Sequence, residues 1–147
     1  NKYALNTEGG VGAGRWRGGF GVIREFEVLI NGAHTYCSFG RNIETPWGLM
    51  GGKNGSLNYM EIVSGDSVER ISRISHKDLN SGDLVRIVTG GGGGFGKPYK
   101  RPVKEVQEDF LDGYINKETA EKDFGVSLDE NGNVDSNLTA TLRLGDH

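Results

Sequence analysis

The sequence predicts an α+β fold: a β-rich body of antiparallel sheets, arranged as a sandwich or like a barrel, with glycine-rich loops and a short two-helix segment near the C-terminus. Short segments rich in β-branched and aromatic residues recur through residues 1–101. The 147 residues include 25 glycines, which gather in clusters between those segments. After Pro102 the apolar residues change to helical spacing. We therefore expect one domain, with a β-rich body at 1–101, a helical hairpin packed on it at 102–125, and a C-terminal tail or strand at 126–147.

The clearest strand is predicted over residues 21–30 (GVIREFEVLI), where charged and apolar residues alternate. Asn31-Gly32 is typical of a tight turn, so residues 34–39 are predicted as the returning strand of a hairpin. Asn80 to Asp83 is typical of a turn that leads into a buried strand. Further extended segments are expected at residues 3–5, 57–63, 69–75 and 84–89.

Two helices are predicted after the β-rich body. The first covers PVKEVQEDFLDG, with Pro102 at its first position and Gly113 at its end. The second covers Asn116 to Phe124, with Asn116 as N-cap and Gly125 as the stop. The carboxylates between Lys104 and Asp112 are most simply a solvated face. The tail contains an Asn-Gly turn and is expected to add a last hairpin or strand.

Composition excludes several classes of partner. The formal charge of -3 and the pI near 5.6 leave no basic footprint for nucleic acid. No apolar run approaches the roughly 18 residues of a membrane span, so no membrane partner is expected. The single cysteine, Cys37, cannot form an internal disulfide, which fits a cytoplasmic location.

The run TGGGGGFGKP (residues 89–98) matches two phosphate-binding patterns on paper. Gly91, Gly93 and Gly96 fit G-x-G-x-x-G, and Gly91 to Lys97 fits part of a P-loop. Both interpretations fail, because no helix follows directly and Pro98 stands where a P-loop needs a hydroxyl. The glycines instead indicate backbone pressed against a second glycine loop, a partner subunit or a ligand oxygen. An anion-binding nest of N–H groups stays a further possibility.

A second candidate contact surface is the segment Arg15-Trp16-Arg17-Gly18-Gly19, where two arginines flank a tryptophan. The alternative is that the arginines only hold the loop shut. Trp47 is either an interface anchor or a plug over the core. The complete set of predicted ligand or subunit contacts is Arg15, Trp16, Arg17, Gly18, Gly19, Trp47, Thr89, Gly91, Gly93 and Gly96.

No catalytic or metal-binding set is predicted. His34, His76 and His147 lack ligand spacing, and Cys37 lies in an expected strand, where a small buried apolar role is favoured over a nucleophile. No acid/base pair or triad stands out. We therefore expect neither a metal ion nor a cofactor to be bound by this chain alone.

Three stretches together resemble the hydantoinase B/oxoprolinase family, which includes N-methylhydantoinase B and 5-oxoprolinase. GGVGAGRWRGGFGVIREFEVL (9–29) is similar to the family's R-G-G segment, and TPWGLMGGKNG (45–55) to its P-W-G segment. The stretch from residue 79 to 126 is similar to its closing segment, with a G-D-x-V motif, the glycine run and two helices. The resemblance runs in order from Tyr3 to Leu128. Lys97 departs from it, since the family usually carries aspartate before the proline.

The resemblance implies that this chain corresponds to the C-terminal part of a longer component, as a small subunit or a domain. It implies as partners a larger hydantoinase B-type chain and a hydantoinase A-type subunit that handles ATP, with a divalent metal in those partners. Family members open lactam or imide rings, and related complexes carboxylate acetone or acetophenone. The expected role is structural, with no activity from this chain alone. The alternative is a self-sufficient β-rich module that binds a sugar or an anion through its glycine loops.

Overall fold

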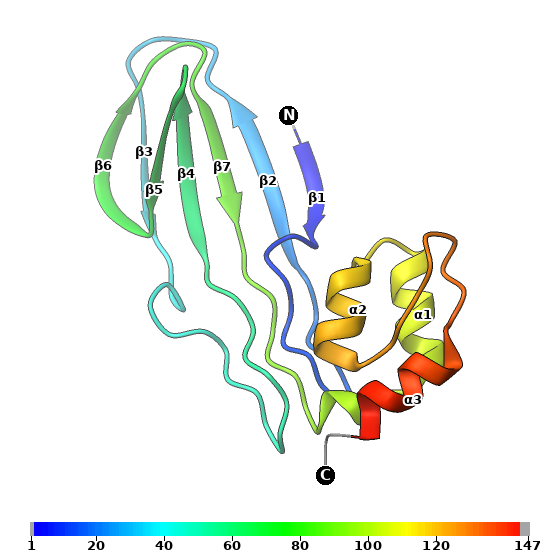
Figure 1. The fold of residues 1–147 in the computed structure, drawn as a ribbon. Coiled ribbons are helices and arrows are strands. Elements are labelled where there is room, and N and C mark those ends of the chain that lie inside the picture. The colour runs from blue at the N-terminus through cyan, green and yellow to red at the C-terminus, as the bar shows by residue number, and fades with distance from the viewer. Residues whose placement is uncertain (1, 145–147) are drawn as a thin grey trace.

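The structure, a computed structural model, describes residues 2–144 and places the strands ahead of the α-helices (Figure 1). The predicted fold class is confirmed: two antiparallel sheets form the body, and they do not close into a barrel within this range. The elements are β1 (Lys2–Asn6), β2 (Gly21–Glu27), β3 (Ala33–Ser38), β4 (Tyr59–Ser64), β5 (Ser67–Ile71), β6 (Arg73–Leu79), β7 (Leu84–Val88), the 3-10 helix η1 (Pro98–Lys100), α1 (Val103–Leu111), α2 (Lys117–Phe124) and α3 (Ser136–Leu144).

The larger sheet has the strand order β1-β2-β7-β4-β5, and the β3-β6 pair packs on one of its faces. Alternation of side chains along each strand separates an apolar from a polar face. Met60, Ile62 and Val85 of the large sheet form one apolar cluster with Leu79 of β6, and Cys37 of β3 packs against it. This cluster is the core of the β-rich body.

The opposite face of the large sheet carries a row of alternating charges across four strands. Glu25, Arg86, Glu61 and Arg70 are successive register partners on β2, β7, β4 and β5. The Arg86 guanidinium lies 2.8 Å from a Glu25 oxygen and 3.1 Å from a Glu61 oxygen, and Arg70 lies 2.8 Å from the other Glu61 oxygen. Each neighbouring pair among β2, β7, β4 and β5 is therefore joined by side-chain ion pairs as well as by backbone hydrogen bonds.

The predicted hairpin between residues 21–30 and 34–39 is wrong. Both edges of β2 are occupied, by β1 and by β7, while β3 crosses to pair with β6. The backbone of Val28 also bonds to the turn before β7, donating to the Asp83 carbonyl at 2.8 Å and accepting from the Gly82 N–H at 2.8 Å. Pairing with a strand far along the chain thus prevails over the local turn signal. The strand expected at 69–75 is also divided, into β5 and β6.

The two predicted helices are confirmed, although α1 begins at Val103 and Pro102 is its N-cap and not its first position. The Asn116 side chain accepts a hydrogen bond from the Thr119 N–H at 2.8 Å and caps α2, and Gly125 ends that helix at φ +61°. Val106, Ala120 and Phe124 form a second buried cluster with Ala13 of the N-terminal loop. The helices are thereby fixed against a glycine-rich segment that precedes β2 by sequence.

The expectation of a C-terminal tail or strand at 126–147 is corrected for residues 136–144, which form α3. Residues 145–147 lie outside the described part of the chain. A single antiparallel bridge, Leu128 to Val134, spans the Asn131-Gly132 turn. The Asp135 carboxylate then accepts from the N–H groups of Asn137 and Leu138 at 3.0 and 2.9 Å. This N-cap outweighs the strand preference of the two threonines that follow.

Candidate functional site

Three glycine-rich segments, residues 9–19, 46–56 and 89–96, lie side by side and continue from the sheet toward the end of the molecule near α3 (Figure 1). We call them the glycine layer. The Gly12 N–H donates to the Gly92 carbonyl at 2.8 Å, Lys53 donates to Ala13 at 2.7 Å, and Gly94 donates to Lys53 at 2.9 Å. Each segment is thus bonded to both of the others, although this region contains only isolated bridges and no regular strand.

Close backbone contact is the reason for the glycines. A Cβ atom added at Gly18 would lie 2.1 Å from the Gly92 carbonyl oxygen, and one at Gly93 would lie 2.1 Å from that of Trp47. At Gly94 the added atom would lie 2.2 Å from the Ala13 oxygen. The sequence left open whether the run contacts a second glycine loop, a partner subunit or a ligand oxygen. Within this chain, residues 90–94 contact other glycine-rich loops.

Most N–H groups of the loop from Thr89 to Gly96 are already engaged. Gly91 donates to the Ser56 hydroxyl at 2.8 Å, Gly92 to the Gly19 carbonyl at 2.9 Å, and Gly96 to the Leu49 carbonyl at 2.9 Å. The Thr89 hydroxyl accepts from the Val22 N–H at 2.8 Å, which ties the layer to β2. These amides are not free to form the anion nest considered from the sequence.

Arg17 fastens the glycine layer to α1. Its Nε and Nη2 donate to the two oxygens of Asp109 at 3.0 and 2.9 Å, and Arg101 donates to the same carboxylate at 3.0 Å. Asp109 is 5% exposed, so the prediction of a solvated acidic face is wrong for this residue. Two-point arginine–carboxylate pairs fix both distance and orientation. Arg17 thus holds the loop against α1, and its predicted contact role stays a prediction.

Arg15, Trp16 and Trp47 lie on the surface side of the layer. The Arg15 guanidinium carbon lies 4.4 Å from the Trp16 ring centroid, and its Nη1 lies 3.5 Å from a Glu105 oxygen. Trp16 and Trp47 are both exposed, so Trp47 is not a plug over the core. Gly18 is buried between segments, whereas Gly19 next to it is exposed. The contact role predicted for these residues stays a prediction.

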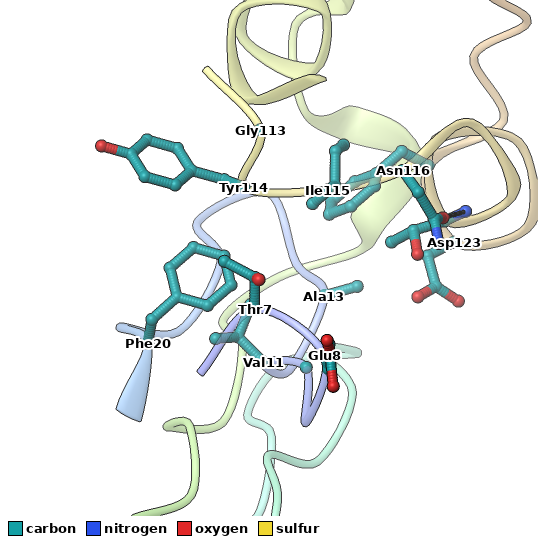
Figure 2. Close-up of a pocket in the computed structure, with 13 residues that line it drawn as sticks. Thr7, Glu8, Val11, Ala13, Phe20, Gly113, Tyr114, Ile115, Asn116 and Asp123 are labelled. Carbon is teal, nitrogen blue, oxygen red and sulfur yellow. Dashed lines mark hydrogen bonds between the residues drawn. The ribbon is translucent and has the colours of Figure 1, made fainter. Parts of the chain in front are cut away.

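A pocket of about 310 Å³ lies between the N-terminal loop and the connection from α1 to α2 (Figure 2). Its wall includes the rings of Phe20 and Tyr114, whose centroids are 5.5 Å apart. The Arg17 guanidinium stacks over both rings, at 4.8 and 5.5 Å. None of the predicted contact residues lines the pocket, although Arg17 supports its wall from behind the rings.

The polar groups around the pocket are partly committed elsewhere. Asp123 accepts from the Lys53 ammonium at 2.7 Å, and the Asn116 oxygen caps α2. Glu8 and the hydroxyls of Thr7 and Thr119 are the other polar groups on its wall. The pocket therefore presents two aromatic rings and a few uncommitted polar groups. No sequence motif pointed to it, because its wall comes from residues far apart along the chain.

Other reactive side chains lie away from this pocket. Burial raises the pKa of the Cys37 thiol in β3, so it stays protonated at neutral pH. The rings of His34 and His76 stack at 4.9 Å, and His76 lies 2.8 Å from Asp78. Among residues 2–144 no group of three or more His, Cys, Asp or Glu side chains is placed to hold a metal ion. His147 lies outside this range. None of the described helices is long and apolar enough to cross a membrane.

The fold and the site define a β-rich unit organised around packed glycine backbone, with α1 fastened to it by a buried ion-pair cluster. The family model described as Hydantoinase B/oxoprolinase matches residues 1–98. The chain is 32% identical, over 97% of its own length, to a Pseudomonas sp. (strain NS671) protein whose name gives it as the B component of a D-/L-hydantoinase. It is 31% identical to the beta chain of the caprolactamase of Pseudomonas jessenii over the same share. This chain belongs to the hydantoinase B/oxoprolinase family, as its motifs predicted.

Solved structures agree with this assignment. The ATP-dependent caprolactamase from Pseudomonas jessenii matches 98% of this chain with a TM-score of 0.85 and 32% identity. Acetone carboxylase matches the same share with a TM-score of 0.82 and 22% identity, which shows a common fold. The chain spans only 24% and 25% of the length of the two Pseudomonas relatives, and 26% and 24% of the two solved chains.

Proposed function

We propose that this chain is a structural part, either a small subunit or the C-terminal domain, of a hydantoinase B-type component in an ATP-dependent enzyme that opens cyclic amides. One observation carries the proposal. The chain aligns over 97% of its own length, yet over only about a quarter of its relatives, 24% and 25%. A unit of this size with its own two apolar clusters acts as one building block of the larger component.

The choice of cyclic amides rests on the relatives above 30% identity. The names of three of them refer to hydantoin, caprolactam and 5-oxoproline, and each of these molecules contains a ring amide. Ketone carboxylation is the second candidate, supported by the fold that acetone carboxylase shares. Both chemistries fit one logic, in which phosphorylation activates the oxygen of an amide's imidate form or of a ketone's enol.

In this proposal the nucleotide and the metal bind outside this chain. ATP belongs to a hydantoinase A-type subunit and the divalent metal to the rest of the hydantoinase B-type component. The lone, half-buried thiol supports a cytoplasmic location.

The role of this chain is then to complete and hold a larger fold. Its glycine layer is closed by backbone bonds, and Arg17 and Arg101 hold α1 against it through Asp109. Such a frame suits precise placement of neighbouring subunits. Arg15, Trp16 and the loop from Thr89 to Gly96 are the parts proposed to contact the larger component.

Native mass spectrometry of the untagged protein, purified from its source cells without denaturant, tests the proposal. If this chain is a small subunit, we expect a defined stoichiometry with a hydantoinase B-type and a hydantoinase A-type polypeptide. If it is a domain, we expect one longer chain that contains it, in complex with a hydantoinase A-type polypeptide. The assembly should release product from a cyclic amide only with ATP. Bicarbonate-dependent consumption of a ketone would favour the second candidate instead. A stable monomer without companions would contradict the subunit role and favour a ligand-binding module, with the aromatic-walled pocket as its site.

A further inference from the structure

The glycine layer ends in loops that lie far from the loop between β2 and β3 (Figure 1). Several residues of this layer carry large, exposed apolar side chains. Backbone bridges join Phe95 to Trp16 on one side and to Leu49 on the other. We call Trp16, Leu49, Met50 and Phe95 the tip patch, and Trp47, two residues before Leu49, extends it. The exposed fractions are Trp16 57%, Trp47 63%, Leu49 54%, Met50 75% and Phe95 50%.

The tip patch does not serve the core of this chain. None of its members belongs to, or packs against, the two buried apolar clusters. Its backbone is nevertheless well fixed, since Trp16 and Phe95 exchange hydrogen bonds at 3.0 and 2.8 Å and Gly96 donates to Leu49 at 2.9 Å. Exposed apolar groups on a fixed frame are typical of protein contact sites, because little freedom is lost on binding.

Met50 adds an independent indication. The turn from Leu49 to Gly52 is closed by the Gly52 N–H donating to the Leu49 carbonyl at 2.9 Å. Both central residues have positive φ, +52° at Met50 and +89° at Gly51. Turns of this kind favour asparagine or glycine at the first central position. A methionine is unfavourable for the isolated fold both in backbone conformation and in exposure, so a contact outside this chain is the simplest reason for it.

Positive charge borders the patch. The Arg15 guanidinium lies over Trp16 at 4.4 Å and that of Arg41 over Trp47 at 4.8 Å. Lys97 lies beside the turn, with its Cγ 3.2 Å from the position of a Cβ added to Gly51. Protein contacts commonly combine an apolar centre with a charged rim of opposite sign on the partner. The matching surface is therefore apolar and bordered by carboxylates.

We propose that the tip patch docks on the portion of the hydantoinase B-type component that this chain lacks. The inference rests on the proposed function and names the surface through which it is carried out. The relatives are about four times as long as this chain, which covers 24% to 26% of them, so each relative contains adjoining polypeptide of sufficient size to cover such a patch. A second copy of this chain is the other possible occupant, and the experiment separates the two.

Hydroxyl-radical footprinting of the assembly purified from source cells tests this docking, with the isolated chain as reference. Met50, Trp16 and Trp47 are reactive and report directly on their own exposure. We expect their oxidation rates to fall about tenfold in the assembly, whereas Tyr36, which is 77% exposed on β3, keeps its rate. Equal protection of Tyr36, or unchanged oxidation of the tip patch, would overturn the inference while leaving the proposed function in place.

A matched pair of variants separates docking from folding. Met50→Asn supplies the residue that the turn favours, so the isolated variant should melt at the wild-type temperature or above it. Its recovery with the hydantoinase B-type companion should fall about tenfold, because a buried methionine side chain is lost. Leu29→Asn removes a similarly exposed side chain, 77% against 75%, at the opposite end of the sheet and should leave recovery unchanged.

The other possible outcomes also decide whether the docking inference holds. An equal loss in both variants, or none in Met50→Asn, would overturn the inference. Dimerisation of the isolated chain that Met50→Asn abolishes would identify a second copy as the occupant and overturn it as well. Purification without a hydantoinase B-type companion, covalent or not, would overturn the proposed function and this inference together.

Discussion

The two β-sheets and the glycine layer, which both lie within the β-rich body, are stabilised by different kinds of contact. In the sheets, side chains supply the contacts: apolar groups such as Met60 and Ile62 fill one face of the sheet, and an ion-pair row crosses the other. In the glycine layer the backbone supplies them, since carbonyl and N–H groups of three segments bond directly where no Cβ would fit. A region without regular secondary structure can therefore tolerate substitution less than a sheet does.

The largest effect is expected from Gly18→Ala in the glycine layer. The added Cβ would lie 2.1 Å from the Gly92 carbonyl oxygen, a backbone atom held by its own hydrogen bonds. We expect the free energy of unfolding to fall by more than about 4 kcal/mol, or the protein not to fold. Thermal denaturation followed by circular dichroism measures this.

Gly19→Ala is the matched control, because no heavy atom lies within 4 Å of its added Cβ. Its unfolding free energy should change by less than about 1 kcal/mol. Equal losses of unfolding free energy at the two neighbouring glycines would contradict this prediction, since they would show that backbone contact does not stabilise the layer.

Met60→Ala tests how much the apolar core of the sheets contributes to stability. Met60 is 1% exposed in the core of the β-rich body, so truncation leaves a cavity. We expect a loss of about 3 kcal/mol in urea denaturation, with the fold retained. Val68→Ala on the exposed side of β5 should cost less than about 1 kcal/mol. If Met60→Ala lowered the free energy of unfolding more than Gly18→Ala does, the sheet core would be the region less tolerant of substitution.

Asp109→Asn tests the link between the glycine layer and the helices. The substitution leaves Arg17 and Arg101 facing a neutral amide in a site that is largely buried, at a cost of about 3 kcal/mol. Glu108→Gln on the same helix, where the carboxylate is 57% exposed, should change stability by less than about 0.5 kcal/mol. If both substitutions had the same small effect, the ion-pair cluster would not be what fastens α1.

The smallest effect is a pH dependence at the turn before β7. The Asn80 N–H, 2.8 Å from the Asp83 carboxylate, lowers the pKa of Asp83 below its ordinary value of 3.8, with help from the Ser64 hydroxyl. The charged form therefore stabilises the fold above that ordinary pKa, and this contribution is lost as the pH falls through the lowered value. The gap in melting temperature between wild type and Asp83→Asn should narrow from pH 6 to pH 3. A constant gap would contradict this.

Local signals in the sequence predicted most elements of this fold but not their partners. Alternation over residues 21–27 located β2, and the Asn116 cap with Gly125 located α2, since both signals act between near neighbours. The pairing of β3 with β6 was missed because it depends on which strands occupy the edges of β2. The helix α3 was missed because one capping carboxylate, Asp135, decides it.

The candidate site was less predictable than the fold. The family motifs marked the glycine segments, but their mutual packing has no side-chain pattern that could show which segments meet. The burial of Asp109 depends on Arg17, which lies 92 residues away along the chain. The pocket lined by Phe20 and Tyr114 likewise combines distant residues. The contact role of Trp16 and Trp47 is a prediction that the footprinting experiment tests.

The mutual bonding of the three glycine segments also couples their lengths. Each segment meets the other two at fixed positions: Ala13 with Lys53, Lys53 with Gly94, and Gly92 with Gly12. One residue inserted into any of them would shift its donors out of step with both neighbours at once, and glycine-only contacts would then face residues that carry a Cβ. Most loops accept insertions because their neighbours are solvent. Here a change of length in one segment would disrupt its contacts with both others, so the layer forms or fails to form as a single unit.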